Sequence, residues 1–328
     1  MKTFLGFDDQ YQRPDLYVSH AITANGAGSA ITTLPVTNLL DPRPSAVWGR
    51  SGIPQGGIVQ VDIPTTVNGS AAERQFAAAV VVVDPYAIRV GTSERHAVNV
   101  RVQVGNFALS TIAYDGTITG GAGFGFSSGR NKVSHAFVFA GRTRSAADML
   151  AVNDGGVTIA AGGTHQAVRV TFTVPNTITG TYELRCSRIM LMRGFYCSAA
   201  QGFALDYDDD SGVARAYDGT PYVQAKPVKA RMAAELIGIE EAQAFGTFPW
   251  RSNLHSVSKI AGKSGTVCFV RDLAASPLNG ATLLNAPQSD ADCIVGLLDA
   301  PIAIQHETLV EGPARSRYRG RLSITSSV

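Results

Sequence analysis

At 328 residues the chain is long enough for two domains, and its composition excludes several kinds of protein. The formal net charge is only +2 and the basic residues are scattered, so neither a nucleic acid nor an acidic membrane is the expected partner. Charged residues account for 16% of the chain, which suits a protein whose surface is largely covered by neighbours. The 34 glycines, together with many threonines and valines, favour strands and turns, so a mainly β fold is expected.

Alternation of apolar and polar residues predicts the strands of the first half. The alternation is clearest over 96–104, and the apolar run within 74–84 predicts a central strand. Between 117 and 163 the pattern weakens and glycine becomes frequent, so we expect an inserted, exposed segment with a possible strand at 133–139. A phosphate-binding glycine loop is the alternative there, but neither usual motif is present. The other expected strands span 16–23, 57–63 and 165–174.

A proline-rich loop over 35–48 interrupts these strands. Its prolines prevent regular ladder or helix hydrogen bonding. The loop nevertheless carries Leu39, Leu40, Val47 and Trp48, whose side chains are expected to point inward. We therefore expect it to cap one end of a β-sandwich.

The stretch 182–197 alternates at first and then becomes continuously apolar from Ile189 to Met192. Such a strand has one buried face at its start and two covered faces further along. We predict a break at Arg193-Gly194 and interpret the stretch as the junction between two β-rich domains. An ordinary core strand within one large domain is the alternative.

An acidic stretch opens the second half. Asp206, Asp208 and Asp210 have the alternate spacing of a calcium-binding loop, in which oxygen ligands converge as the chain coils round the ion. However, glycine stands at the seventh position rather than the sixth, and Tyr217 occupies the place of the bidentate glutamate. A solvated hairpin or linker is the alternative, and it is the interpretation we prefer.

One helix is predicted in the second half, within 239–254. There Ile239, Ala242 and Phe245 share one helical face, and Pro249 ends or kinks the helix. The remaining segments are predicted as strands, at 213–217, from about 222, and at 226–236, 265–272, 292–298, 302–306 and 318–325.

Two of these strand predictions carry further expectations. The strands at 292–298 and 302–306 are expected to form a close pair. The densest basic run, 315–321, alternates, so we interpret it as the solvent face of a late strand rather than as a phosphate-binding tract.

The order of segments in the first half resembles a known family. The segments are Asn38-Leu-Leu-Asp-Pro-Arg-Pro-Ser-Ala-Val-Trp48, Ile58-Val-Gln-Val-Asp-Ile63, a long valine strand and the closing strand Glu183 to Phe195. Together they resemble the discoidin-type, galactose-binding-like jelly-roll domains carried by tail proteins of tailed bacteriophages. The resemblance implies a jelly-roll β-sandwich over 1–198, with the glycine-rich insertion at about 117–163.

The order of elements in the second half resembles the tail-tube-like β-sandwich of phage distal-tail and minor tail proteins. This resemblance covers 199–328, is less specific in its residues, and implies a β-sandwich or barrel with one packed helix that assembles into a ring. It implies sixfold symmetry, with threefold symmetry as the alternative. The implied partners are copies of the chain and other tail proteins, namely the tube, hub, tape-measure and receptor-binding proteins.

No catalytic centre is predicted. No Gly-x-Ser-x-Gly motif occurs, and the six histidines lie mostly in strand-like or inserted segments. A pair of carboxylates suited to glycoside hydrolysis is not evident either. The cysteines show neither CxxC pairing nor metal spacing, so free buried thiols are expected at Cys186, Cys197, Cys268 and Cys293. We therefore expect neither an enzyme nor a cofactor, and no metal beyond the weak calcium candidate.

Three functional hypotheses follow. The first is a structural virion protein at the phage tail tip or baseplate, made in the host cytoplasm, because no export signal or membrane span is evident. The second is a carbohydrate-binding adhesin that contacts host surface glycans through Trp48 or the glycine-rich segment. Trp48 is, however, more simply explained as a core residue. The third is a tail-associated glycan hydrolase.

Overall fold

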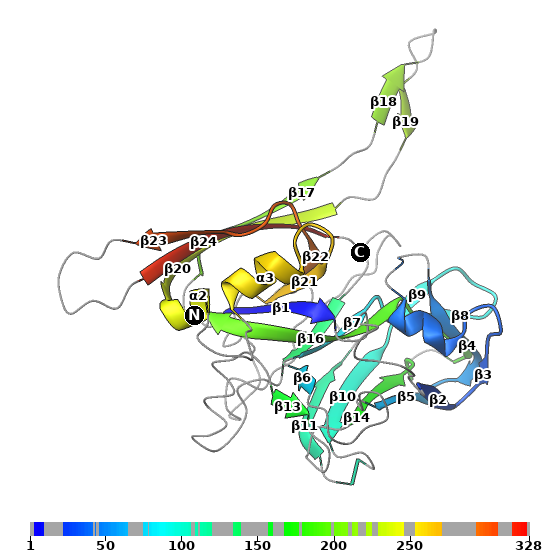
Figure 1. Cartoon of the computed structure of the whole chain (residues 1–328). Coiled ribbons are helices and arrows are strands. Elements are labelled where there is room, and N and C mark those ends of the chain that lie inside the picture. Colours follow the sequence, from blue (N-terminus) through cyan, green and yellow to red (C-terminus); the bar gives the residue numbers. More distant parts are fainter. Residues whose placement is uncertain are drawn as a thin grey trace.

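The computed structural model describes residues 3–9, 22–41, 43, 46–64, 75–77, 79–105, 109–110, 112–119, 134–138, 157–159, 167–176, 179–197, 200–208, 212–215, 221–224, 229–245, 253–270, 293–307 and 317–326. The described chain consists mainly of antiparallel strands, as the composition predicts (Figure 1). The predicted strand at 16–23 and the glycine-rich stretch 120–133 lie outside these residues, except for the last two residues of the former.

The largest sheet has ten strands and runs through both halves of the chain. Its order is β12 (Ser134–Val138), β7 (Ala79–Val83), β16 (Arg188–Cys197), β1 (Thr3–Asp9), β21 (Thr266–Val270), β22 (Cys293–Leu298), β24 (Arg317–Ser326), β20 (Lys229–Glu240) and β17 (Ala200–Asp208), with β23 (Ala303–Glu307) also paired to β24. The boundary predicted at 198 falls between β16 and β17, and the sheet continues past it through β1 and β21.

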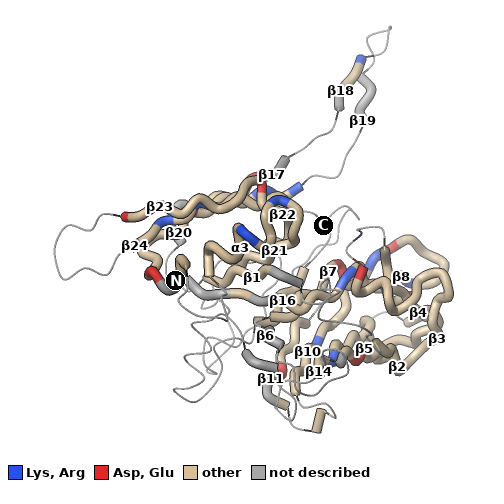
Figure 2. Tube along the Cα trace, in the orientation of Figure 1, with Lys and Arg blue, Asp and Glu red and all other residues tan. Residues whose placement is uncertain are grey.

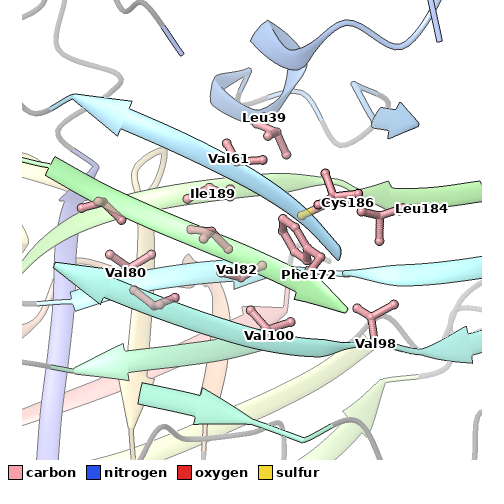
Figure 3. Close-up of a cluster of buried hydrophobic side chains, with 14 of the residues drawn as sticks. Leu39, Val61, Val80, Val82, Val98, Val100, Phe172, Leu184, Cys186 and Ile189 are labelled. Atoms are coloured by element: carbon pink, nitrogen blue, oxygen red, sulfur yellow. The ribbon is translucent and has the colours of Figure 1, made fainter. Parts of the chain in front are cut away.

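Two five-stranded sheets complete a sandwich in the first half. One consists of β11 (Ile112–Ile118), β10 (Asn99–Gly105), β14 (Ala167–Thr173), β5 (Ile58–Pro64) and β2 (Thr23–Gly26). The other consists of β3 (Ser29–Ala30), β4 (Trp48–Pro54), β15 (Thr181–Cys186), β8 (Tyr86–Arg89) and β9 (Arg95–Ala97). Inward side chains of both sheets meet those of β7, β12 and β16 in one apolar core, part of which Figure 3 shows. A sandwich of this kind agrees with the predicted jelly-roll class.

Two long strands bend where they pass from one sheet to the next. β7 continues into β8 through Asp84, which has a positive φ of 49°, and β15 continues into β16 through Ser187. The Ser187 amide donates to the Val83 carbonyl oxygen at 3.0 Å, so the two bends are joined. The alternating stretch 96–104 also divides, at Val98, between β9 in one sheet and β10 in another. Alternation alone cannot show such a change of sheet, because the period of two is the same on both sides.

The proline-rich loop caps the sandwich as predicted. Within it, Val36–Leu40 forms the short 3-10 helix η2, and Leu39 is fully buried. Leu40 packs against the same core from a half-buried position.

A second core lies in the other half of the molecule. It joins apolar residues of β20, β24, β21 and β1 with those of the helix α3 (Leu254–Ile260), which lies against the sheet (Figure 1). Asn253 caps this helix, because its Oδ1 accepts from the Ser256 amide at 2.7 Å. The helix predicted within 239–254 is confirmed only in part: β20 extends to Glu240, the short α2 (Glu241–Ala244) follows it, and 246–252 lie outside the described residues.

A third apolar cluster lies between these two cores. Its side chains come from six strands, β12, β7, β16, β1, β21 and β22, and the sheet curls until β12 and β22 are in contact. β1 contributes side chains to both clusters: Phe4 belongs to the central cluster, and Leu5 and Phe7 belong to the second core. The first strand of the chain, which was not predicted, therefore links the two halves.

Two further expectations need correction. The strands β22 and β23 do not pair with each other; each pairs with β24 instead. The predicted break at Arg193-Gly194 is also absent, because β16 pairs with β1 in continuous register from Arg193 to Cys197. The remaining short strands, β6 (Gln75–Ala77) with β13 (Val157–Ile159) and β18 (Gly212–Arg215) with β19 (Pro221–Gln224), form two separate two-stranded sheets.

Candidate interaction surfaces

Trp48, the residue proposed to contact glycans, lies inside the sandwich. Its side chain is 1% exposed, and its ring packs on Phe172 with 5.7 Å between centroids. A sugar platform needs an exposed aromatic face, and in this structure Trp48 offers none. Its position matches the alternative interpretation, that of a core residue.

Of the three aspartates proposed as calcium ligands, two lie within the described residues. Asp206 and Asp208 lie on the strand β17, where Asp206 is exposed and pairs in register with Arg231. An extended strand does not coil round an ion as a calcium loop does. Asp210 lies outside the described residues. Within the described part of the chain, no group of three or more potential metal ligands comes together.

Cys186 and His135 are a thiol and an imidazole that are both buried in the first half of the molecule. The Cys186 thiol donates to the Val83 carbonyl oxygen at 3.3 Å, and burial raises its pKa. His135 on β12 is 5% exposed, and burial lowers the pKa of its imidazole to about 4. Its Nδ1 atom has no hydrogen-bond partner among the described residues. Both hydrogen bonds of the Cys186 thiol go to backbone carbonyl oxygens, so this thiol is not paired with the imidazole of His135.

The side chain of Arg50 on β4 forms hydrogen bonds with the backbone of β2 and of the turn that follows it. The guanidinium is almost buried and donates to four backbone carbonyl oxygens: those of Ala24 at 2.7 Å, Gly26 and Ala27 at 3.1 Å, and Gly28 at 2.6 Å. These oxygens belong to β2 and to the turn that follows it. One nearly buried cation thus ties the turn after β2 to the strand β4.

The outer face of the second half carries a ladder of ion pairs. Arg321 Nε donates to Glu235 at 3.3 Å, and Arg319 donates to Glu307 at 3.1 Å. Figure 2 shows charged residues along β20 and β24. The prediction that the run 315–321 supplies the solvent face of a strand is confirmed for both arginines, which pair with carboxylates across neighbouring strands.

Exposed aromatic side chains gather beside the short helices. Phe245 is 44% exposed, and its ring meets Tyr318 edge-on with 5.0 Å between centroids. His255 and His306 extend this group, at 6.2 Å from Phe245 and 5.3 Å from Tyr318 respectively. Sequence reasoning missed this surface because it placed Phe245 on the buried face of a longer helix.

The hairpin of β18 and β19 stands clear of the rest of the molecule (Figure 1). Within the described chain these two strands pair only with each other. The hairpin follows β17, which forms one edge of the ten-stranded sheet and carries Leu205, 46% exposed. Edge strands and isolated hairpins have backbone groups and apolar side chains that another molecule can cover.

The comparisons with known proteins add no functional assignment. No protein-family model and no curated protein matches the chain. Among solved structures, the family 32 carbohydrate-binding module of C. perfringens NanJ, in complex with galactose, aligns with 59% of this chain and 100% of its own length, at 7% identity and a TM-score of 0.28. A likeness at that level carries no argument about the site. Among the described residues, no helix is long and apolar enough to cross a membrane.

Proposed function

We propose that this protein is a structural subunit of a multi-copy assembly, namely a distal-tail or baseplate protein of a long-tailed bacteriophage. The proposal rests on the segments 38–48 and 183–195, which resemble phage tail jelly rolls, and on one structural observation. That observation is the hairpin of β18 and β19, which stands away from every core.

The hairpin supports an assembly role for an energetic reason. Two four-residue strands without a covering layer are marginally stable in water. Contact with a neighbouring subunit would supply that layer and would also cover the exposed edge of β17. Repetition of one such heterologous contact round an axis closes a ring.

Deletion of the hairpin tests this proposal. The variant replaces residues 212–224 with a short glycine-serine turn, and native mass spectrometry compares its oligomers with those of the full chain. We expect rings from the full chain and monomers from the variant, with unchanged thermal unfolding of the monomer. The control is Val90→Ser, which alters an exposed apolar residue on the sandwich, far along the chain from the hairpin, and should leave the rings intact.

Two results would contradict the proposal. One is a full chain that stays monomeric at high concentration and forms no ring in electron micrographs of the phage tail. The other is glycan-array binding by a monomer that is unaffected by deletion of the hairpin, which would favour the carbohydrate-binding hypothesis.

A further inference from the structure

The central cluster holds two thiols side by side. The Sγ atoms of Cys268 on β21 and Cys293 on β22 lie 3.5 Å apart. Both side chains are buried, at 0% and 6% exposure, and neither is part of a disulfide. They are the only described pair of cysteines in contact, because Cys186 lies in the sandwich core and donates to a carbonyl group instead.

The strand register brings these cysteines together. Cys268 stands opposite Val295, and Cys293 stands opposite Val270. The cysteines are therefore diagonal neighbours on the face that packs into the central cluster. A disulfide has an S–S distance of about 2.0 Å, so the sulfur atoms would need to approach by about 1.5 Å. Rotation about the two Cα–Cβ bonds, together with a small relative shift of the two strands, would supply a movement of that size.

We propose that Cys268 and Cys293 form a covalent modification site, which closes to an intramolecular disulfide when the protein enters an oxidising medium. The oxidant by chemical class is a low-molecular-weight disulfide, such as oxidised glutathione. The link ties β21 to β22 and so fixes two of the six strands that enclose the central cluster. This inference does not depend on the proposed function.

The chemistry proceeds in two exchanges. Cys293 lies at the first residue of β22 and is the more exposed of the two, so its thiolate attacks the external disulfide first. One external thiolate leaves, and a mixed disulfide forms on Cys293. The Cys268 thiolate then attacks the Cys293 sulfur and expels the second external thiolate. Two protein thiols are oxidised to one disulfide, and one external disulfide is reduced to two thiols.

The link would close a loop of chain between residues 25 positions apart. Closure restricts the unfolded chain more than the folded one, in which the two sulfur atoms are already neighbours. The oxidised protein should therefore unfold at a higher temperature than the reduced protein, by about 5 °C.

Peptide mapping of the full chain tests the site. The protein is incubated with oxidised glutathione or with a reducing dithiol, denatured in N-ethylmaleimide and digested with trypsin. Cleavage after Lys263, Arg271 and Arg315 separates Cys268, in 264–271, from Cys293, in 272–315. We expect the two peptides to be joined after oxidation, with a combined mass lower by two hydrogens than the sum of the free thiols. Reduction should release them.

Variants provide matched controls. Cys186→Ala should form the link as the wild-type chain does, whereas Cys268→Ala should melt at the same temperature in both media and carry a glutathione adduct on the 272–315 peptide. The proposal fails if both peptides of the oxidised wild-type chain are recovered separately and alkylated, or if either is joined to Cys197 instead. Because the mapping uses the wild-type chain, this result does not depend on whether a variant folds.

Discussion

His135 shows at the scale of one residue how burial determines charge. The residue lies on a strand whose five side chains are all buried, and its imidazole has no described partner at Nδ1. Burial disfavours the charged imidazolium and therefore lowers the pKa to about 4. Between about pH 6.5 and pH 4, the imidazole of His135 therefore binds a proton in the unfolded chain but not in the folded chain.

This difference predicts an acid-sensitive fold. As the pH falls from about 6.5 towards 4, the free energy of unfolding should decrease by on the order of 3 kcal/mol because of this residue. His135→Leu should lose that part of the dependence, which thermal unfolding between about pH 7 and pH 4.5 would measure.

His306→Gln is the matched control for this experiment. His306 is exposed, and its replacement leaves the buried imidazole of His135 in place, so the loss of stability caused by His135 at low pH should persist in this variant. Parallel pH profiles for the wild-type chain and His135→Leu would contradict the prediction.

At the scale of an element, the pairing of β16 with β1 depends on a glycine. Gly194 stands opposite Gly6, and a methyl group on Gly194 would collide with the ring of Phe4 and come within 2.7 Å of the Leu5 carbonyl oxygen. Phe4 is fully buried in the central cluster, so its ring could withdraw only by displacing packed neighbours. Sequence analysis interpreted Arg193-Gly194 as the end of a strand, whereas the glycine allows close packing between strands.

Gly194→Ala should therefore destabilise the protein by about 2 kcal/mol through overpacking. Phe4→Leu should relieve part of this cost, so the double variant should be more stable than the sum of the two single effects predicts. Chemical unfolding of the four proteins completes the cycle. Strict additivity would show that the alanine does not meet Phe4.

Sequence reasoning located most strands but not their neighbours. Valine-rich and alternating segments such as 79–83 and 167–173 were predicted because their side chains repeat with the period of a sheet. β1 was missed because its residues follow the start of the chain with little alternation, and its partners lie far along the sequence. The diagonal contact of Cys268 and Cys293 likewise depends on register, which spacing does not show.

At the scale of the whole molecule, β1 makes the two halves interdependent. It lies between β16 and β21, and its side chains enter both the central cluster and the second core. The prediction of separate domains at 1–198 and 199–328 is therefore open to a direct test. Removal of 199–328 would expose the edge of β1 that pairs with β21, and removal of 1–198 would take β1 away, so either truncation would uncover much of the central cluster.

We expect that neither fragment, 1–198 or 199–328, will unfold cooperatively when prepared alone, and that mixing the two will restore a cooperative transition. A fragment that begins at residue 10 should fail to complement 199–328, because it lacks β1. Near-ultraviolet circular dichroism with thermal unfolding measures both results. Cooperative unfolding of an isolated fragment would instead support the two-domain prediction.

The position of β1 also has a consequence for biosynthesis. The ribosome makes this strand before its partners, and Phe4 can pair with Tyr196 and Val270 only after more than 260 further residues have been translated. At usual bacterial elongation rates that delay is on the order of tens of seconds. During this time the apolar residues of β1 lack their partner strands, so the ten-stranded sheet cannot form completely before β21 has been made. Chaperone demand in the producing cell should therefore persist until β21 has been translated.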